Sequence, residues 1–569
     1  MDFKRKIADT IASALEIVYG DAALSTEDIM GMLEVPPEQA MGNFAFPCFR
    51  LSKVLRKAPP MISDALAVAI DEAYLERVES VKGYLNFYLD RSVFAREVLE
   101  LAAAQGANYG GSDVGSGKTV CIDYSSINIA KRFHIGHLSS TMIGHALSQL
   151  YRFSGYNVVS INHLGDWGTQ FGKMICAYKK WGDRKTVERG GVDEMVKLYV
   201  RFDQESQNNE ALADEGRAWF KKIESGDAEA LEIFDWFKSV TLKDAERVYD
   251  LLGVQFDSYA GEAFYNDKMD VVVDELADKG LLTDSDGAKI VDLEAYSMPP
   301  CLIVKKDGAT LYATRDLAAA FYRKKTYDFS KCLYVVAYQQ DLHFRQWFKV
   351  IKLMGYDWYK DLEHVSFGMV SYEGETLSTR KGHIVYLEDL LTEAIAKARA
   401  IVEEKSPNLD NKDEVARQVG VGAVVFFDLY NNRIKDIDFW WDRALNFDGE
   451  TAPYVQYTHA RCASVLRKAE GEVAPIDYTA LSDPETQAVI RVIDQFPGTV
   501  AMAIERSEPS MITRYAVDLA QAYNKFYYEQ RILDGEQGAR AARLALTQIA
   551  KQTIQTALRL IGIESPERM

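Results

Sequence analysis

Two histidines three residues apart, His134 and His137, bracket Ile135 and Gly136 in the run YSSINIAKRFHIGHLSS (124–140). The chain has eight histidines, and four of them lie between residues 134 and 163. Imidazole nitrogens can donate hydrogen bonds to a phosphoryl group as negative charge moves onto it. Gly136 leaves room for the close approach of a flat base or a ribose. The spacing therefore favours a nucleotide site that stabilises a transition state by hydrogen bonds, with no covalent intermediate.

Two other interpretations of this histidine pair remain open from the residues alone. The two side chains could simply cap the helix that follows them. They could also bind a metal ion, although an HxxH pair with no nearby Glu or Cys partner is a weak metal motif.

The segments around the pair have the pattern of a strand, a helix and a second strand. KTVCIDYSS (118–126) and NVVSIN (157–162) are apolar and β-prone. Between them apolar residues recur at helical spacing until Gly155 ends the helix, namely Leu138, Met142, Ala146, Leu150 and Phe153. Such a unit of about 45 residues implies a parallel sheet. The histidines would then lie at the carboxyl edge of that sheet and at a helix N-terminus, where phosphate binds readily.

The rest of the chain divides into regions of different character. Residues 1–108 mix helical periodicity with β-rich runs, which predicts an α+β domain. Residues 109–440 carry the parallel sheet, with a charged helical insertion at about 175–290 and strand-like runs at 301–314, 331–340 and 364–372. From about residue 390 nearly everything has helical periodicity, so residues 441–569 are expected to form an all-helical domain.

Composition narrows the class of protein. Hydrophobic residues make up 48% and charged residues 26%, and no apolar stretch is long enough to span a bilayer. The N-terminus lacks the apolar block of a signal peptide, so we expect a soluble cytoplasmic protein. The net charge of −18 is mild evidence against nucleic-acid binding, although an acidic protein can carry one basic face. No two of the six cysteines lie within four residues, which favours buried thiols over structural zinc or disulfides.

The glycine-rich run YGGSDVGSGKT (109–119) partly matches a phosphate-binding loop. The GxxxxGK[ST] pattern needs a glycine where Ser112 stands, and the run precedes a strand instead of following one. We interpret it as a linker between domains.

HIGH at 134–137, after a strand and at the start of a helix, resembles the signature of class I aminoacyl-tRNA synthetases. Longer runs resemble the arginyl-tRNA synthetase family, in the same order and over nearly the whole chain. They are MGNFAFPCF (41–49), SSINIAKRFHIGHLSSTMIGHAL (125–147), NHLGDWGTQFG (162–172), LYATRDLAAA (311–320), YVVAYQQDLHFRQ (334–346), LSTRKGHIV (377–385) and PERM (566–569).

The resemblance implies an α/β fold with a Rossmann-like parallel-sheet catalytic domain, an N-terminal domain that contacts tRNA and a helical anticodon-binding domain. It also implies an enzyme that activates L-arginine with ATP and Mg2+ and transfers it to the 3′-terminal adenosine of tRNA(Arg). No structural zinc is expected. We further expect a cytoplasmic monomer that needs bound tRNA before it activates arginine, as the family generally does.

For ATP, the resemblance assigns the phosphates and ribose to His134 and His137, and it places Gly136 under the adenine. The second class I signature, KMSKS, is replaced by TLSTR at 376–380, so threonine stands in place of both lysines. The resemblance assigns ATP contacts there to Ser378 and Thr379. It assigns the compensating positive charge to Lys131, just before HIGH, and to Arg380 and Lys381.

Arginine as a substrate makes a physical demand, because a guanidinium has five donors and no acceptor and needs carboxylates around it. Tyr312 and Asp316 are four residues apart, so they share one face if the segment is helical. The resemblance assigns the arginine side chain to Tyr312, Asp316, Gln340 and Asp123. It assigns the α-amino and carboxylate groups to Ser126 and Asn128. For each residue, a polar strand end or cap is the structural alternative.

For tRNA, the resemblance points to both ends of the chain. Phe44 and Phe46 are candidates for stacking in the N-terminal domain, with burial in the core as the alternative. Aromatic residues interleaved with basic ones in the C-terminal helices are candidates for contact with an unstacked anticodon. They are Tyr454, Tyr457, His459, Arg461 and Tyr523.

Three other functions stay open at this point. A synthetase for another amino acid fits Tyr312 and Asp316 less well than arginine does. A catalytically inactive tRNA-binding protein would explain the altered TLSTR segment, although the intact HIGH run and Lys131 oppose it. A small nucleotidyltransferase would have no need of the long helical region after the sheet.

Overall fold

The computed structural model describes residues 3–20, 24–36, 41–306, 312–376, 384–469 and 474–569 of the 569-residue chain. These residues form two compact units. Unit 1 comprises Met1–Tyr109, Arg461–Phe496 and Asp518–Thr553, and unit 2 comprises Gly110–Ala460, Pro497–Val517 and Ile554–Met569.

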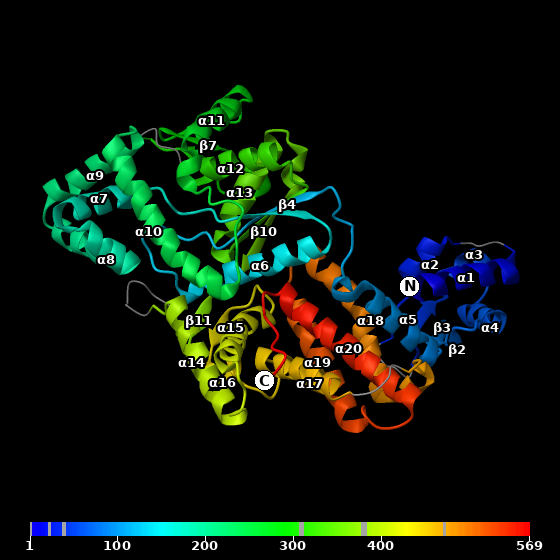
Figure 1. Ribbon diagram of the computed structural model, residues 1–569. Coiled ribbons are helices and arrows are strands. Elements are labelled where there is room, and N and C mark those ends of the chain that lie inside the picture. The colour runs from blue at the N-terminus through cyan, green and yellow to red at the C-terminus, as the bar shows by residue number, and fades with distance from the viewer. Residues whose placement is uncertain (1–2, 21–23, 37–40, 307–311, 377–383, 470–473) are drawn as a thin grey trace. The chain divides into compact units, whose positions relative to one another are not determined.

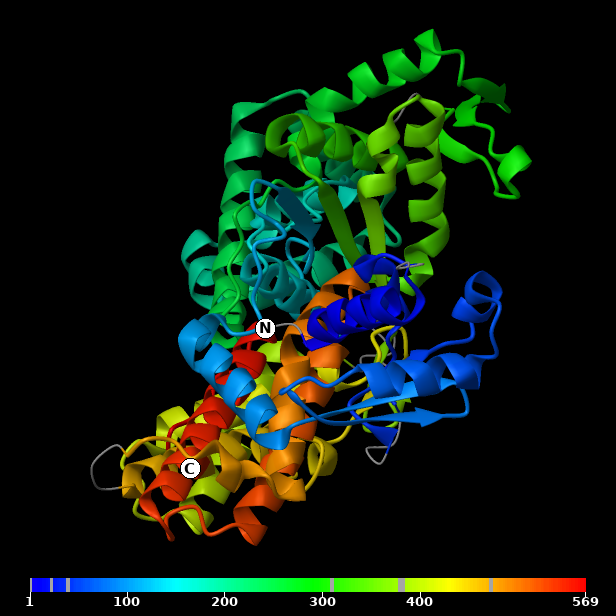
Figure 2. The same ribbon diagram turned by 90° about the vertical axis from the view of Figure 1, so that its right-hand side faces the viewer.

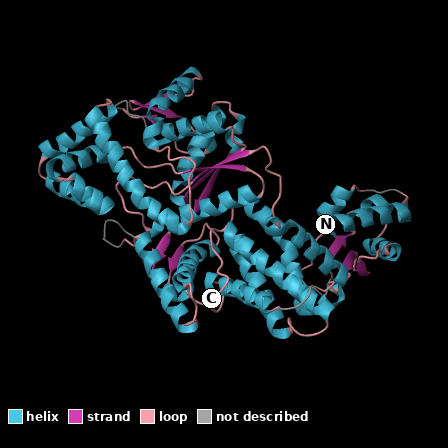
Figure 3. Ribbon diagram, viewed as in Figure 1, coloured by secondary structure: helices cyan, strands magenta, loops and turns pink. Residues whose placement is uncertain are grey.

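Unit 2 is built around a four-stranded parallel sheet (Figures 1 and 3). Its strands are β4 (Thr119–Asp123), β5 (Asn157–Ile161), β9 (Lys331–Ala337) and β10 (Leu362–Phe367), in the spatial order β10-β9-β4-β5. Helix α6 (Leu138–Phe153) connects β4 to β5, and α13 (Asp341–Leu353) connects β9 to β10. From the boundary between β4 and β9, one connection leads outward to β5 at one edge of the sheet and the other leads outward to β10 at the opposite edge. That boundary is a topological switch point, where α/β sheets form a ligand crevice.

Helix α6 follows the histidine pair and is almost entirely buried, because it is packed on both sides. It contacts strands β4, β5 and β9 of the sheet and, on its other side, α15 (Lys412–Tyr430). The apolar residues predicted to form its buried face, from Leu138 to Leu150, are buried. The helix ends at Phe153, and Gly155 follows with a φ of 82°. The predicted strand–helix–strand unit is therefore confirmed.

The insertion between β5 and β9 is mostly helical, as expected. Its helices are α7 (Thr169–Trp181), α8 (Arg184–Ser206), α9 (Glu210–Glu224), α10 (Ala228–Leu252), η4 (Glu262–Lys268) and α11 (Met269–Asp278). A small antiparallel sheet follows, with the order β6 (Thr283–Ser285), β7 (Ala288–Val291) and β8 (Cys301–Val304). The strand-like run 301–314 is only partly a strand, because Tyr312 begins helix α12 (Tyr312–Tyr327).

The run 364–372 also differs from a single strand. Gly368 separates β10 from β11 (Val370–Tyr372), which pairs in another sheet with β12 (Glu375–Thr376) and β13 (Ile437–Phe439). A Cβ atom at Gly368 would lie 2.3 Å from the Lys435 carbonyl oxygen, so the chain turns where only glycine fits. Strand β13 lies in the region after about residue 390, where nearly everything was expected to be helical. Around it are α14 (Leu387–Lys405), α15 and α16 (Trp441–Ala444).

Unit 1 contains the antiparallel sheet β1-β3-β2, which is drawn in blue in Figure 2. Its strands are β1 (Phe44–Pro47), β2 (Leu75–Val81) and β3 (Tyr84–Leu89), so the mixed α and β character predicted for residues 1–108 is confirmed. The helices of this part are α1 (Phe3–Tyr19), α2 (Thr26–Met32), α3 (Leu51–Leu55), α4 (Pro59–Ala69) and α5 (Arg91–Gln105). The last helices of the chain are α17 (Ala452–Lys468), α18 (Pro484–Glu505), α19 (Ser510–Glu529) and α20 (Gln537–Leu560).

Two expectations from composition can be compared with this fold. All six cysteines are among the described residues, and each is buried as a free thiol. Among the described helices we find none with the length and apolar character that a membrane span requires.

Candidate active site

The histidine pair lies at the carboxyl end of β4, in a short 3-10 turn (η3, Ile135–His137) that leads into α6. The two imidazole rings are in contact, with centroids 3.9 Å apart and planes inclined by 36°. The Gly136 N–H donates to Nδ1 of His134 at 3.1 Å, and the His134 N–H donates to Nδ1 of His137 at 3.2 Å. The interpretation of the pair as helix caps is thus partly correct, since both rings accept backbone bonds.

These backbone bonds fix the protonation of the two rings. Burial lowers the pKa of His137 to about 3, and the neighbouring His134 ring adds to the shift. Burial also lowers the pKa of His134, with Lys131 as the second cause. Both rings are therefore neutral at pH 7, and because each Nδ1 accepts a bond, each proton is on Nε2. The turn therefore presents two neutral N–H donors, which can form hydrogen bonds with phosphate.

Gly136 has a steric reason to be glycine that the sequence did not reveal. A Cβ atom at this position would lie 2.9 Å from Cε1 and 3.0 Å from Nδ1 of the His134 ring. The absence of a side chain thus lets His134 fold back over the turn.

The loop between β4 and the histidines has a strained backbone. Ser125, Ser126 and Ala130 have positive φ angles of 70°, 47° and 61°, which non-glycine residues rarely adopt. Buried hydrogen bonds hold this conformation: the Ser125 hydroxyl is 2.8 Å from Oη of Tyr249, and the Ala130 N–H donates to Oγ1 of Thr241 at 3.1 Å. Both partners lie on α10, so the insertion determines the shape of this loop. Strain held by surrounding structure is common at functional sites.

The segment that follows TLSTR reaches the histidine turn. The Ile135 N–H donates to the Val385 carbonyl and the Leu387 N–H donates to the Phe133 carbonyl, both at 2.9 Å. His134 also forms a β-bridge with Tyr386. Residues 385–387, which follow the second signature in the sequence, therefore lie against the histidine turn. Ser378, Thr379, Arg380 and Lys381 lie outside the described residues.

Four carboxylates form an acidic group that begins at the carboxyl end of β4. It consists of Asp123 at the end of β4, Asp166 after β5, Glu262 in η4 and Asp316 in α12. The charges of Asp123, Asp166 and Asp316 raise the pKa of the buried His163 against the stronger lowering effect of burial. Those of Asp166 and Asp316 raise the pKa of Glu262. Burial raises the pKa of Glu262 to about 7, against the opposing effect of Arg315.

Three permanent cations accompany these four carboxylates. The ion pairs are Asp123–Arg323 at 2.8 Å, Asp166–Lys238 at 2.7 Å and Glu262–Arg315 at 3.3 Å. Asp316 is paired instead with an imidazole, at 2.6 Å from Nε2 of His343. The group therefore has one more carboxylate than it has fixed cations, so it is suited to one further cation.

Asp123 has partners within the protein. One of its oxygens pairs with the buried Arg323, and the other accepts a hydrogen bond from the Ser126 hydroxyl at 3.0 Å. Both carboxylate oxygens are thus already engaged inside the protein. Because each carboxylate oxygen can accept a second bond, the predicted contact of Asp123 with arginine stays a prediction, and its contacts within the protein hold Arg323 and Ser126.

The other predicted residues of this region are accessible. Tyr312 is 67% exposed and lies one helical turn before Asp316 on α12, so the expected shared face exists. Gln340 is exposed in the turn that follows β9, and α13 begins directly after it. Asn128 and Lys131 are exposed in the loop before the histidines.

Sequence reasoning missed three residues of the site: His163, Asp166 and Glu262. The first two lie in the run NHLGDWG, whose position after a predicted strand was a usable signal. Glu262 lies in the insertion, and nothing local in YAGEAFY distinguishes it from a surface acid. Its raised pKa arises from burial and from the nearby charges of Asp316 and Asp166, all of which depend on tertiary structure.

The predicted tRNA-contacting side chains differ in exposure. Phe46, His459 and Tyr523 are completely buried, so their predicted stacking on RNA is wrong in this structure. The sequence pattern that suggested RNA binding is aromatic residues next to charged ones. The same pattern is typical of an amphipathic helix or strand that packs on a core. Phe44 and Tyr454 are partly buried, Tyr457 is 43% exposed, and Arg461 is partly buried beside the rings of Tyr527 and Tyr528.

Three family models match the chain in succession. Residues 3–89 match the arginyl tRNA synthetase N terminal domain, residues 99–441 the catalytic domain of class I (R) tRNA synthetases, and residues 455–569 the DALR anticodon binding domain. The chain is 52% identical over its whole length to the full arginine–tRNA ligase of Alkaliphilus metalliredigens. It is 54% identical to that of Clostridioides difficile, again over the full length of both chains.

Solved structures agree with these matches. The arginyl-tRNA synthetase of Thermus thermophilus superposes with a TM-score of 0.81 at 25% identity, covering all of both chains. The arginyl-tRNA synthetase of Plasmodium falciparum has the same fold, with a TM-score of 0.80 at 22% identity over all of this chain and 99% of that one.

Proposed function

The chain belongs to the arginyl-tRNA synthetases, and on that basis we propose which of its residues carry each part of the reaction. It is an ATP-dependent arginine–tRNA ligase. In the first step the arginine carboxylate attacks the α-phosphorus of ATP and pyrophosphate leaves. In the second step a hydroxyl of the 3′-terminal adenosine of tRNA attacks the carbonyl carbon of arginyl-adenylate, and AMP leaves.

On the ATP side, His134 and His137 would donate from Nε2–H to phosphoryl oxygens. The support is their shared neutral state, with each Nδ1 occupied by a backbone N–H. Because no proton must be gained or lost, the two donors are ready before charge develops on the phosphates. Gly136 leaves room for the His134 ring, its place under the adenine remains a proposal from the family resemblance, and Lys131 adds positive charge. Ser378, Thr379, Arg380 and Lys381 remain proposed contacts from the TLSTR region.

On the arginine side, the guanidinium would enter the acidic group. The single observation that carries this proposal is that the acidic group contains four carboxylates and only three fixed cations. Asp316 and Glu262 are the proposed charge partners, with Tyr312 and Gln340 on the accessible side. Ser126 and Asn128, at the strained loop, are the proposed contacts for the α-amino and carboxylate groups.

Mg2+ would arrive with ATP, because it is usually held by substrate phosphates and one or two carboxylates. In the described part of the chain, no three or more His, Cys, Asp or Glu side chains are grouped to hold a metal ion. When bound, Mg2+ would neutralise phosphate charge. The residues named above would bind and orient the substrates beside it.

For tRNA(Arg), we propose that residues 1–108 and 441–569 make contacts outside the catalytic domain, residues 109–440. The matched N-terminal and anticodon-binding models support this division. Phe44, Tyr454, Tyr457 and Arg461 remain as proposed contacts, since each is at least partly exposed. We further propose that the enzyme acts as a monomer in the cytoplasm.

A charging assay tests the amino-acid choice. Wild-type enzyme with tRNA(Arg) transcript and ATP should form arginyl-tRNA, and lysine at the same concentration should give none, because the acidic group needs a planar guanidinium to use its carboxylates in pairs. Preferential charging with lysine, or charging of neither, would contradict the proposed pocket.

The raised pKa of Glu262 leads to a pH prediction. Because burial raises this pKa to about 7, the carboxyl group is largely protonated below that pH and cannot pair with a guanidinium. The kcat/KM for arginine should therefore rise between about pH 6 and about pH 8, by up to roughly tenfold per pH unit below the pKa. Arg315 at 3.3 Å, Asp316 and Asp166 are the charged groups that surround Glu262.

The matched variant is Glu262→Gln, which keeps the shape and removes the titration. Its kcat/KM for arginine should be low and nearly independent of pH over the same range. If the variant kept the wild-type pH profile, the profile would belong to another group and the assignment of Glu262 would be wrong.

A further inference from the structure

A pocket of about 320 Å³ lies within unit 1, where the antiparallel sheet meets the first turns of α5 and α18. The sheet and the residues just before β1 form one wall. Helix α5 contributes Arg91, and α18 contributes Gln487 and Arg491. None of the residues that line this pocket has a part in the proposed reaction, so that reaction does not account for the charges found here.

Two arginines line this pocket without a carboxylate partner. Neither Arg91 nor Arg491 forms an ion pair with any residue that the structure describes, and Arg91 donates only from Nη1 to the Ser482 carbonyl, at 2.8 Å. Burial lowers the pKa of the half-buried Arg491, and the charge of Arg91 lowers it further. The fold therefore holds two like charges near each other, an arrangement that is unfavourable until an anion binds.

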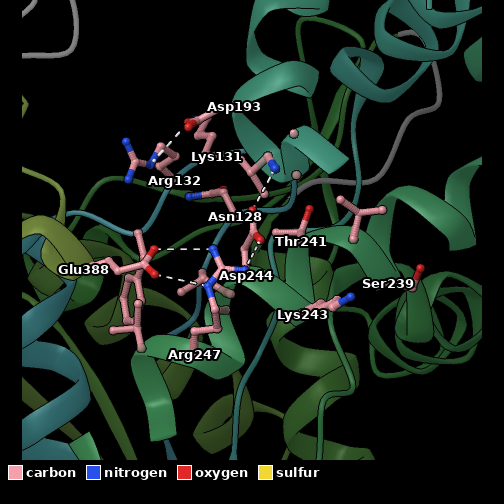
Figure 4. Close-up of a pocket in the computed structure, with 18 of the residues that line it drawn as sticks. Asn128, Lys131, Arg132, Asp193, Ser239, Thr241, Lys243, Asp244, Arg247 and Glu388 are labelled. Atoms are coloured by element: carbon pink, nitrogen blue, oxygen red, sulfur yellow. Dashed lines mark hydrogen bonds and ion pairs between the residues drawn. The ribbon is translucent and has the colours of Figure 1, made fainter. Parts of the chain in front are cut away.

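An arginine in the cavity beside the histidine turn shows the more usual arrangement. There Arg247 pairs with Asp244 at 2.8 Å and with Glu388 at 3.1 Å (Figure 4). In the described lining of the unit 1 pocket the acid is Glu76, and Arg77 already binds it at 3.0 Å. The positive charge of the other two arginines is therefore not compensated by the lining.

Hydrogen bonds fix the walls of the pocket before any ligand binds. Nε2 of Gln487 donates to the Arg91 carbonyl at 3.1 Å and to the Leu481 carbonyl at 2.7 Å, so it ties the start of α5 to α18. The Leu89 N–H donates to Oδ1 of Asn43 at 3.0 Å, which leaves the amide nitrogen of Asn43 as a donor for a ligand. Donors that are already held in place lose little entropy when they bind an anion.

We infer that this pocket is a phosphate-binding site, with Arg91 and Arg491 as the charge partners and Asn43 as a further donor. A guanidinium can form two parallel hydrogen bonds with a phosphate group. A phosphate group carries up to two negative charges, which match the two arginines, whereas a single carboxylate would leave one of them uncompensated. A small phosphate-bearing molecule or an RNA backbone could supply the group. The inference goes beyond the proposed function and does not depend on it.

The test uses inorganic phosphate and a tRNA(Arg) transcript as its two probes. The enzymes are wild type, Arg91→Gln, Arg491→Gln, the double variant and Arg491→Lys. Arg96→Gln is the control, because Arg96 is an exposed arginine of α5 that does not line the pocket. Phosphate binding is measured from the rise in melting temperature at constant ionic strength, with chloride as the balancing anion. Dissociation constants for tRNA are measured at several salt concentrations.

The catalytic residues are the same in every one of these enzymes. Phosphate that binds at the histidine turn therefore contributes equally to all of them, and the differences between variants report on the unit 1 pocket.

Wild type and Arg96→Gln should bind inorganic phosphate about tenfold more tightly than the double variant, because each guanidinium supplies a charged hydrogen bond. Arg491→Lys should keep part of the affinity, since it keeps the charge and loses the fork. A tRNA salt slope reduced by about 1 in the double variant, and not in Arg96→Gln, would identify an RNA backbone as the source. An unchanged slope together with lost phosphate binding would identify a small molecule.

Wild-type binding of both probes by the double variant would overturn the inference. Without phosphate, the glutamine variants should melt at or above the temperature of the wild type, because a repulsion between like charges is removed. A lower melting temperature with unchanged binding of both probes would mean that the two arginines are structural. Failure of the wild type to charge arginine would reject the proposed function and leave the result for this pocket unaffected.

Discussion

Replacement of His137 by alanine is expected to slow arginine activation by about 100-fold or more, because it removes a preorganised donor to the developing phosphoryl charge. The donor is neutral and its Nδ1 is held by the His134 N–H at 3.2 Å, so Nε2–H has a single orientation. The loss should appear mainly in kcat, since the bond strengthens as charge develops. The measurement is ATP–pyrophosphate exchange with arginine in the presence of tRNA(Arg).

His137→Asn separates the structural part of this side chain from the catalytic part. An asparagine amide can still accept from the His134 N–H near the position of Nδ1, but it has no group at the position of Nε2. This variant should keep the melting temperature of the wild type and lose activity as the alanine variant does. His137→Gln, which carries an amide nitrogen near the position of Nε2, should recover part of the rate. Wild-type exchange in His137→Asn would show that His137 only shapes the turn.

Asp316→Asn is expected to raise the KM for arginine by about 30-fold or more. The reason is the loss of a charge partner of the guanidinium, for which about 2 kcal/mol is a lower estimate at a desolvated site. Asparagine has the same shape and can keep a hydrogen bond to His343, which lies 2.6 Å from the carboxylate. The KM for ATP should change by less than about twofold, because the histidine turn has separate hydrogen bonds.

Asp284→Asn is the matched control, since Asp284 is an exposed acid of β6 that pairs with Lys289 at the surface. It should leave both KM values unchanged. If Asp316→Asn raised the two KM values equally, the variant would have disturbed the whole site, and the guanidinium would have to be placed elsewhere.

Local sequence pattern was sufficient for the part of the site that is continuous in the chain. Strand β4, the histidine turn and α6 follow one another within 35 residues, from Thr119 to Phe153, and their apolar spacing and Gly155 indicate each boundary. The spacing of Tyr312 and Asp316 also indicated one face of a helix. The sequence did not reveal that α12 begins at Tyr312, because YAT is as compatible with a strand as with a helix.

Tertiary contacts determine the ion pairs, pKa values and burial of the other predicted residues. In the sequence, Asp123 is a carboxylate at a strand end with no evident partner. In the structure, Nη2 of Arg323, 200 residues further along the chain, lies 2.8 Å from its Oδ2 atom. Glu262 is distinctive only because the fold buries it beside Asp166 and Asp316. Phe46 and Tyr523 have neighbours typical of RNA-binding residues and are nevertheless buried. A pattern of residue types does not indicate which partner will come from a distant element.

ATP–pyrophosphate exchange with each of the twenty amino acids, with and without tRNA(Arg), tests the central claim most directly. The neutral histidine turn and the acidic group predict exchange with arginine alone, and the family resemblance predicts that it requires tRNA. Absence of exchange with every amino acid, in a protein that still binds tRNA, would contradict the claim. It would mean that the threonines of the TLSTR segment have removed the activation step and that the chain is a tRNA-binding relative without catalysis.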